Sequence, residues 1–151
     1  MTQRAFVALG SNLGDRWAFL RLGVSMLPDV IGASQVYETD PVGGPMDQGP
    51  FLNMVVELHT DRSARQLLEV ARAAEAAAGR VRIERNGPRT LDVDILLVAD
   101  ERLEDPDFVV PHPRMWERRF VLQPLSDLAP ELLPPDWETR VVGDVHPVGN
   151  L

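Results

Sequence analysis

The sequence contains no lysine and no cysteine, and each absence excludes whole classes of chemistry. All fifteen basic residues among the 151 are arginine. A phosphate loop that ends in lysine, a Schiff-base enzyme and a lysine-held pyridoxal cofactor are therefore excluded. The lack of cysteine excludes thiol nucleophiles, thiolate zinc sites and disulfides.

Long apolar runs and a surplus of positive charge are missing as well. No uncharged stretch approaches the roughly twenty residues of a membrane span, and the N-terminus lacks the pattern of a signal peptide. We therefore expect a soluble, cytoplasmic protein without a membrane partner. The net charge of -8 and the pI near 4.8 argue against nucleic acid as the main partner. At this length we expect residues 1–151 to form a single domain.

The positive charge is concentrated in two short segments of this acidic chain. Seven of the fifteen arginines fall within residues 80–89 and 114–119. A positive field focused in this way suits a small anionic ligand better than a long polyanion.

The most informative segment is the run from Gly87 to Leu97, which holds Asp92 and Asp94 just after Arg89 and just before an apolar stretch. On a strand, residues i and i+2 point to the same face, about 7 Å apart. An isolated Asp-x-Asp is more often a solvated pair at a strand end. Beside a cluster of arginines, which bind phosphate oxygens, the pair instead favours a site for Mg²⁺ and a nucleotide.

The hydrophobic pattern predicts an α+β fold with the element order β-α-β-β-α-β. Ser63 and Gln66 form a capping box at the start of the second helix, and Gly79 ends it. The order is that of a ferredoxin-like fold, with both helices on one face of an antiparallel four-stranded sheet. The predicted strands cover residues 5–9, 31–38, 51–58 and 90–98, and the predicted helices cover about 16–27, 63–78 and 114–128.

Two long loops, at residues 39–50 and 80–88, are expected at the same side of the sheet as the aspartate pair. The tail after Glu131 contains several prolines and has no clear period.

Six segments together resemble the 6-hydroxymethyl-7,8-dihydropterin pyrophosphokinase family of folate biosynthesis. The resemblance spans residues 8 to about 132, and its most specific string is Gly-Pro-Arg-Thr-Leu-Asp-Val-Asp at 87–94. The other matching segments are residues 8–14, 37–39, 51–53, 79–82 and 110–115. The chain departs from the family pattern at Asp40, Phe51, Asn86 and Pro113.

The resemblance implies transfer of pyrophosphate from the co-substrate ATP to 6-hydroxymethyl-7,8-dihydropterin, which gives the pterin diphosphate and AMP. It implies a monomer that uses two Mg²⁺ ions held by Asp92 and Asp94. Further residues have implied roles. The implied catalytic residues are Asp92 and Asp94 together with Arg80, Arg82 and Arg89. These arginines would also bind the nucleotide, together with Glu75, Ile95, His112 and Arg118. The pterin pocket would comprise Thr39, Val42, Phe51, Asn53 and Phe120.

An alternative hypothesis assigns the chain to another functional class, a non-catalytic, ferredoxin-like module that binds a ligand or regulates another protein. It would explain the fold but would leave Asp92 and Asp94 without a task. An RNA-binding module is less favoured, because residues 51–54 lack the interleaved aromatic and basic residues of an RNA-stacking sheet. Mg²⁺-dependent ATP binding with formation of AMP distinguishes the enzyme from both.

Overall fold

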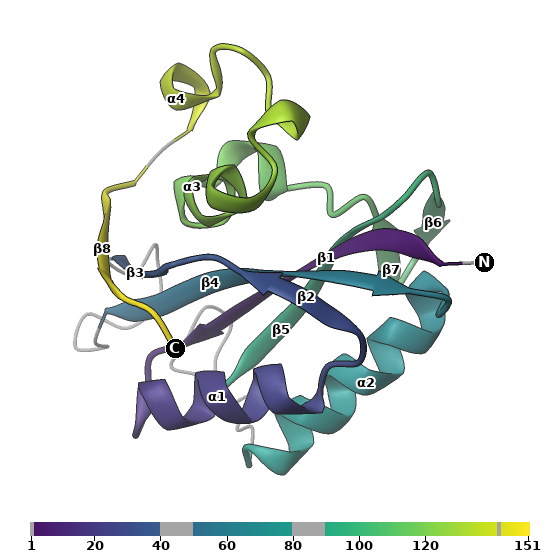
Figure 1. Ribbon diagram of the computed structural model, residues 1–151, viewed down its shortest axis with the longest axis horizontal. Coiled ribbons are helices and arrows are strands. Elements are labelled where there is room, and N and C mark those ends of the chain that lie inside the picture. The colour runs from purple at the N-terminus through teal and green to yellow at the C-terminus, as the bar shows by residue number, and fades with distance from the viewer. Residues whose placement is uncertain (1, 40–49, 80–89, 142) are drawn as a thin grey trace.

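A central antiparallel sheet carries helices on both faces in the computed structural model of the protein (Figure 1). The structure describes residues 2–39, 50–79, 90–141 and 143–151. The strand order is β5-β1-β4-β3-β8, and β2 pairs with a further part of β4. The strands are β1 (Gln3–Ser11), β2 (Val30–Ala33), β3 (Val36–Thr39), β4 (Phe51–Thr60), β5 (Asp92–Val98) and β8 (Val145–Gly149).

Four helices and a separate hairpin complete the described elements. No helix in the described ranges is long and apolar enough to cross a membrane. The helices are α1 (Arg16–Met26), α2 (Ala64–Ala77), α3 (Arg119–Leu128) and α4 (Trp137–Arg140). The hairpin consists of β6 (Leu103–Asp105) and β7 (Phe108–Val110), and short 3-10 turns occur at Met115–Glu117 and Pro130–Leu132.

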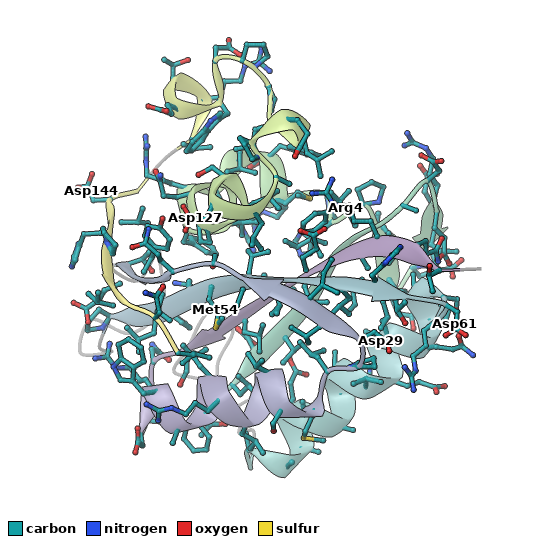
Figure 2. All side chains as sticks on the ribbon, viewed as in Figure 1. Arg4, Asp29, Met54, Asp61, Asp127 and Asp144 are labelled. Carbon is teal, nitrogen blue, oxygen red and sulfur yellow. The ribbon has the colours of Figure 1, made fainter. Side chains whose placement is uncertain are left out.

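The central strands are buried on both faces, which produces two apolar cores. Along β1, Val7 and Leu9 belong to the core beneath α1 and α2, whereas Phe6 belongs to the core beneath α3. Side chains alternate between faces along a strand, so β1 contributes to both cores. In Figure 2, Met54 lies on the α1 side of the sheet and Asp127 lies on α3 above it.

The predicted ferredoxin-like core is confirmed. The order β5-β1-β4-β3 places the first and last core strands side by side, and α1 and α2 cover one face (Figure 1). The predicted capping box is also present: the Gln66 N–H donates to Ser63 Oγ at 3.2 Å, and the Ser63 N–H donates to Gln66 Oε1 at 2.8 Å. Gly79 follows the helix with φ +67°, the left-handed conformation that glycine adopts readily.

Two predicted elements differ from those observed. The single strand expected at 31–38 is divided into β2 and β3 at Ser34, whose buried hydroxyl accepts a hydrogen bond from the Val55 N–H at 2.9 Å. A hydroxyl thus replaces a strand carbonyl at this point. The helix expected at 114–128 begins as a 3-10 turn, and α3 starts only at Arg119.

The tail, for which the pattern predicted nothing, contributes β8. This strand pairs with β3, with Val145 opposite Thr39, and thereby widens the sheet. His146 Nε2 lies 3.5 Å from Glu38 Oε1, and Arg16 contacts the other oxygen of Glu38 at 3.1 Å. The short length of β8 and its proline conceal the alternation that identifies a strand.

The register of the central strands brings one end of the sheet together. Gly10 of β1 lies opposite Asn53 of β4 on one side and opposite Asp92 of β5 on the other. Thr39 lies opposite Phe51 at the same end. The described residues that flank both predicted loops therefore lie at the end that carries the aspartates. Residues 40–49 and 80–89 themselves lie outside the described ranges.

Candidate active site

Asp92 and Asp94 project from the same face of β5, as the i, i+2 spacing predicts. They lie opposite Gly10 and Ala8, while Val93 and Ile95 are buried in the core beneath α1 and α2. The aspartate side chains therefore lie on the α3 face of the sheet. Asp92 is half-buried and Asp94 is exposed, so solvent and ligands reach the pair although the strand itself is buried.

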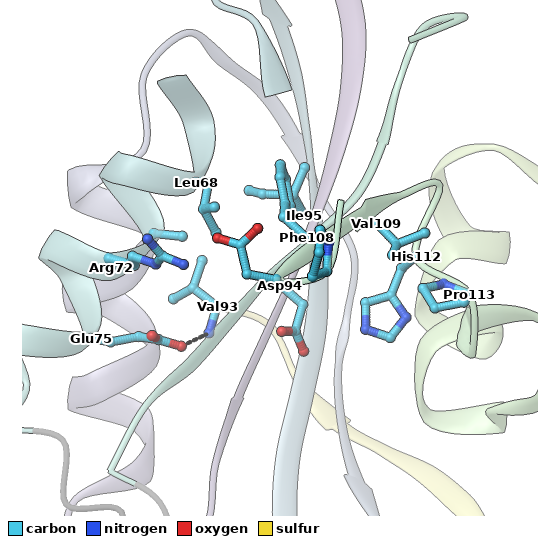
Figure 3. A pocket seen from close by; sticks show the side chains of 13 residues that line it. Leu68, Arg72, Glu75, Val93, Asp94, Ile95, Phe108, Val109, His112 and Pro113 are labelled. Carbon is cyan, nitrogen blue, oxygen red and sulfur yellow. Dashed lines mark hydrogen bonds between the residues drawn. The ribbon is translucent and has the colours of Figure 1, made fainter. Parts of the chain in front are cut away.

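Glu75 of α2 holds the outer edge of β5 between the two aspartates. Its Oε2 accepts a hydrogen bond from the Val93 N–H at 2.9 Å, which Figure 3 shows as a dashed line. This backbone N–H belongs to a strand at the end of the described sheet. The carboxylate therefore satisfies a donor that a further strand would otherwise bind.

Arg118 lies at the start of α3 and faces the aspartate pair. Its Cζ atom is 5.4 Å from the centre of the Phe120 ring. Burial and then repulsion from Arg114 lower the pKa of the Arg118 guanidinium, while Asp94 and Asp92 act in the opposite direction. Arginine nevertheless remains protonated in proteins. The side chain is thus a partly desolvated cation, which interacts more strongly with an anion than an exposed arginine does.

His112 lies beside β5, where its backbone N–H donates to the Leu96 carbonyl at 2.9 Å. Burial, followed by the charges of Arg118 and Arg114, lowers the pKa of His112 below its ordinary value of 6.5. The ring is therefore neutral near pH 7. Its Nδ1 accepts from the Arg114 N–H at 3.3 Å, which assigns the single ring proton to Nε2 and makes Nε2 a donor.

A second polar group lies on the same face, on β4, where Asn53 pairs with Gly10 of β1. The Asn53 amide donates to Thr39 Oγ1 at 2.8 Å, and Thr39 and Asn53 are both buried. A Cβ atom at Gly10 would lie only 2.8 Å from Asn53 Oδ1, so the glycine leaves the space that this amide occupies. Phe51 lies opposite Thr39, and Phe120 comes from the helix that covers this face.

A cavity of about 510 Å³ lies between α2, β5 and the β6–β7 hairpin (Figure 3). Apolar residues are more numerous in its lining, and the polar lining residues are Arg72, Glu75, Asp94, Asp107 and His112. Sequence reasoning identified Glu75, Asp94, Ile95 and His112 but missed other lining residues. The turn residues Pro106 and Asp107, just before the apolar run Phe108–Val110, could have indicated the hairpin, but not its contact with α2. The missed lining residues include Leu68, Arg72, Phe108 and Val109.

The donor set of the aspartate pair fits magnesium. Within the described ranges, no group of three or more histidine, aspartate or glutamate side chains could hold a metal ion. Two hard carboxylates suit Mg²⁺, which takes one or two protein carboxylates and completes its shell with substrate phosphates and water. Six residues named from the sequence lie outside the described ranges: Asp40, Val42, Arg80, Arg82, Asn86 and Arg89.

Comparison with known proteins identifies the family. The family model for 7,8-dihydro-6-hydroxymethylpterin-pyrophosphokinase (HPPK) matches residues 6–130. A Bacillus subtilis (strain 168) protein named 2-amino-4-hydroxy-6-hydroxymethyldihydropteridine pyrophosphokinase is 47% identical over 137 residues, which are 87% of this chain and 81% of that protein. A Pseudomonas aeruginosa protein of the same name is 45% identical over 141 residues, 90% of this chain and 86% of its own.

The fold is also shared with a longer protein of known structure. The crystal structure of Plasmodium falciparum HPPK-DHPS wild type matches with a TM-score of 0.62 at 15% identity, over 87% of this chain and 38% of that one. At this identity the likeness concerns the fold alone. On the match of the family model and of the relatives, the chain belongs to the 7,8-dihydro-6-hydroxymethylpterin-pyrophosphokinase family.

Proposed function

We propose that this chain transfers the terminal pyrophosphate of ATP to 6-hydroxymethyl-7,8-dihydropterin and releases AMP. The observation that carries the proposal is the row Asp92–Gly10–Asn53, which places a carboxylate suited to a metal and an amide suited to a heterocycle on one face. Membership of the pyrophosphokinase family supports the same activity. A module that only bound a ligand would leave the aspartate pair without a task.

The reaction requires positioning and charge stabilisation but no protein nucleophile. The hydroxymethyl oxygen of the pterin attacks the β-phosphorus of ATP and loses its proton. The bond from this phosphorus to the oxygen that bridges it to the α-phosphorus breaks, and AMP leaves with the electron pair. A site that holds the oxygen and the β-phosphorus in line therefore supplies most of the catalysis.

The cavity beside β5 is suited to the nucleotide. Its apolar walls, which include Val93 and Ile95, fit a purine ring, and His112, a proposed phosphate ligand, lines its polar part. His112 would donate from Nε2 to a phosphate oxygen, and the partly desolvated Arg118 would neutralise phosphate charge. We also propose, from the sequence, that the charge on the transferred group is neutralised by Arg80, Arg82 and Arg89.

Asp92 and Asp94 would hold two Mg²⁺ ions at the junction between nucleotide and pterin. When bound, these ions would neutralise phosphate charge and orient the attacking oxygen. The protein supplies the rigidity, because β5 is paired with β1 on one edge and held by Glu75 on the other.

The pterin would lie on the side of Gly10 that faces β4. Asn53 offers a donor and an acceptor in one plane, and its bond to Thr39 fixes the orientation of the amide. Phe51 and Phe120 would pack against the flat ring, and Val42 is expected to complete the pocket. A single domain that acts as a monomer stays a prediction from the sequence.

The first experiment is an assay of the purified protein with ATP, Mg²⁺ and 6-hydroxymethyl-7,8-dihydropterin, followed by chromatography of the nucleotides. AMP that forms only when the pterin is present supports pyrophosphoryl transfer. ADP would indicate ordinary phosphoryl transfer. Nucleotide binding without turnover would favour the ligand-binding module.

Replacement of either proposed metal ligand should nearly abolish turnover. We expect Asp92→Ala or Asp94→Ala to lower kcat by about a hundred- to thousandfold, because charge at the β-phosphorus loses its stabilisation. Asp100→Ala, at an exposed turn beyond the far end of β5, is the control and should keep full activity. Circular dichroism checks the fold of each variant. Near-normal turnover in the two site variants would contradict the metal assignment.

The pterin side can be tested without changing a proposed ligand. Gly10→Ala should displace the Asn53 amide and raise KM for the pterin by about tenfold, the effect of one poorly aligned buried hydrogen bond. The KM for ATP should stay the same. Gly32→Ala is a matched control, since a Cβ there meets Leu128 at an ordinary 3.5 Å. Equal changes in both KM values would show that Gly10 supports the whole site.

The lowered pKa of His112 predicts how stability depends on pH. The unfolded chain takes up the proton at the ordinary pKa of 6.5, whereas the native state does so only at lower pH. Stability is therefore lost as the pH falls. Between about pH 7.5 and pH 5, wild type should lose free energy of unfolding relative to His112→Gln in urea titrations. If the free energies of unfolding of the two proteins changed in parallel with pH, the pKa of His112 would not be lowered by folding.

A further inference from the structure

The β6–β7 hairpin forms one wall of the cavity without joining the main sheet. Its two strands pair with each other in a separate two-stranded sheet. Pro106 and Asp107 form its turn, and these two residues, with Phe108 and Val109, line the cavity. Just beyond β7 the His112 N–H bonds to the Leu96 carbonyl of β5, but the turn end of this wall depends on side-chain contacts with the rest of the protein.

Arg65, an exposed residue in the first turn of α2, contacts the hairpin from outside the cavity. Its guanidinium is paired with Asp105 and lies 3.6 Å from Asp107 Oδ1. The same group lies over the Phe108 ring, 5.4 Å from its centre. One cation therefore holds both sides of the hairpin turn and an aromatic ring that lines the cavity.

The charge of Arg65 has a second consequence. Asp105 and Asp107 raise the pKa of the Arg65 guanidinium, which remains protonated. Without this cation, the carboxylates of Asp105 and Asp107 would lie uncompensated beside the proposed nucleotide cavity. They would repel a nucleoside triphosphate there. The contact thus supports a nucleotide both sterically and electrostatically.

We propose that Arg65 is a positioning residue for the nucleoside triphosphate, because it holds the hairpin turn and Phe108 against the cavity and neutralises Asp105 and Asp107. This inference rests on the proposed function of the cavity. Arg65 lies outside the cavity and acts through the hairpin. It should therefore affect the affinity for the nucleotide and not the chemical step or the pterin.

The test compares Arg65→Met, which keeps an apolar stem, with Arg62→Met as a matched control. Arg62 has nearly the same side-chain exposure, 43% against 44%, and also pairs with one exposed carboxylate, that of Asp29 at 3.3 Å. Steady-state kinetics should give KM and kcat for Mg²⁺-ATP and for the pterin. Arg65→Met should raise KM for ATP about three- to tenfold, a modest change because exposed ion pairs and cation–π contacts are individually weak.

Three further results are expected if Arg65 acts through the hairpin. The kcat and the KM for the pterin should stay within about twofold of wild type. Arg62→Met should match wild type in every parameter. Adding Asp105→Asn and Asp107→Asn to Arg65→Met should lower KM for ATP again, because the uncompensated charges are removed. A merely structural role would give no such recovery.

Several outcomes would overturn the proposal. An unchanged KM for ATP in Arg65→Met would show that the hairpin needs no clamp, and an equal rise in Arg62→Met would show a general effect of lost surface charge. A fall in kcat alone would place Arg65 in the chemical step.

Failure of the proposed function can be recognised separately. Calorimetry of wild type with Mg²⁺ and an ATP analogue that carries methylene between its α- and β-phosphorus measures binding without turnover. Wild type that neither binds this analogue nor forms AMP refutes the function of the cavity itself. Normal binding and turnover by both wild type and Arg65→Met refutes only the role of Arg65.

Discussion

The hydrogen-bond register of β1 between β4 and β5 is the constraint on which the rest of the site depends. It places Gly10 between Asn53 and Asp92, so the amide and the carboxylate lie two strand spacings apart, about 10 Å. A slip by one residue would turn the aspartates toward α1 and α2 and bury them in the apolar core. The same alternation that builds two cores therefore determines which side chains reach a ligand.

Electrostatics add selectivity to this geometry. The chain is acidic overall, yet Arg118 lies partly buried near the two aspartates, and His112 is held neutral beside it. A neutral imidazole with a fixed tautomer contributes a donor without adding to the repulsion among nearby guanidinium groups. The site thus combines cations, hydrogen-bond donors and carboxylates within one face of the sheet. This combination suits a polyphosphate that arrives with its own metal ions.

Local signals in the sequence predicted the core of the fold well. Ser63, Gln66 and Gly79 fixed the ends of α2 because capping depends on a few neighbouring residues. The spacing of Asp92 and Asp94 predicted their common face because strand alternation is local too. The break at Ser34 and the hairpin against α2 were not predictable in this way. Each depends on a partner distant in sequence, Val55 for Ser34 and Arg65 for the hairpin.

The strand β8 lies beyond residue 130, where the match to the family model ends. By pairing with β3 it moves the margin of the sheet away from the buried residues Tyr37 and Thr39. The new margin contains Pro147, which has no N–H to offer to another chain, and its side chains are mostly exposed. Such a strand is a poor template for further pairing. The tail therefore protects this side of the sheet against intermolecular β-association, which would otherwise begin at a strand that leads directly into the proposed pterin pocket.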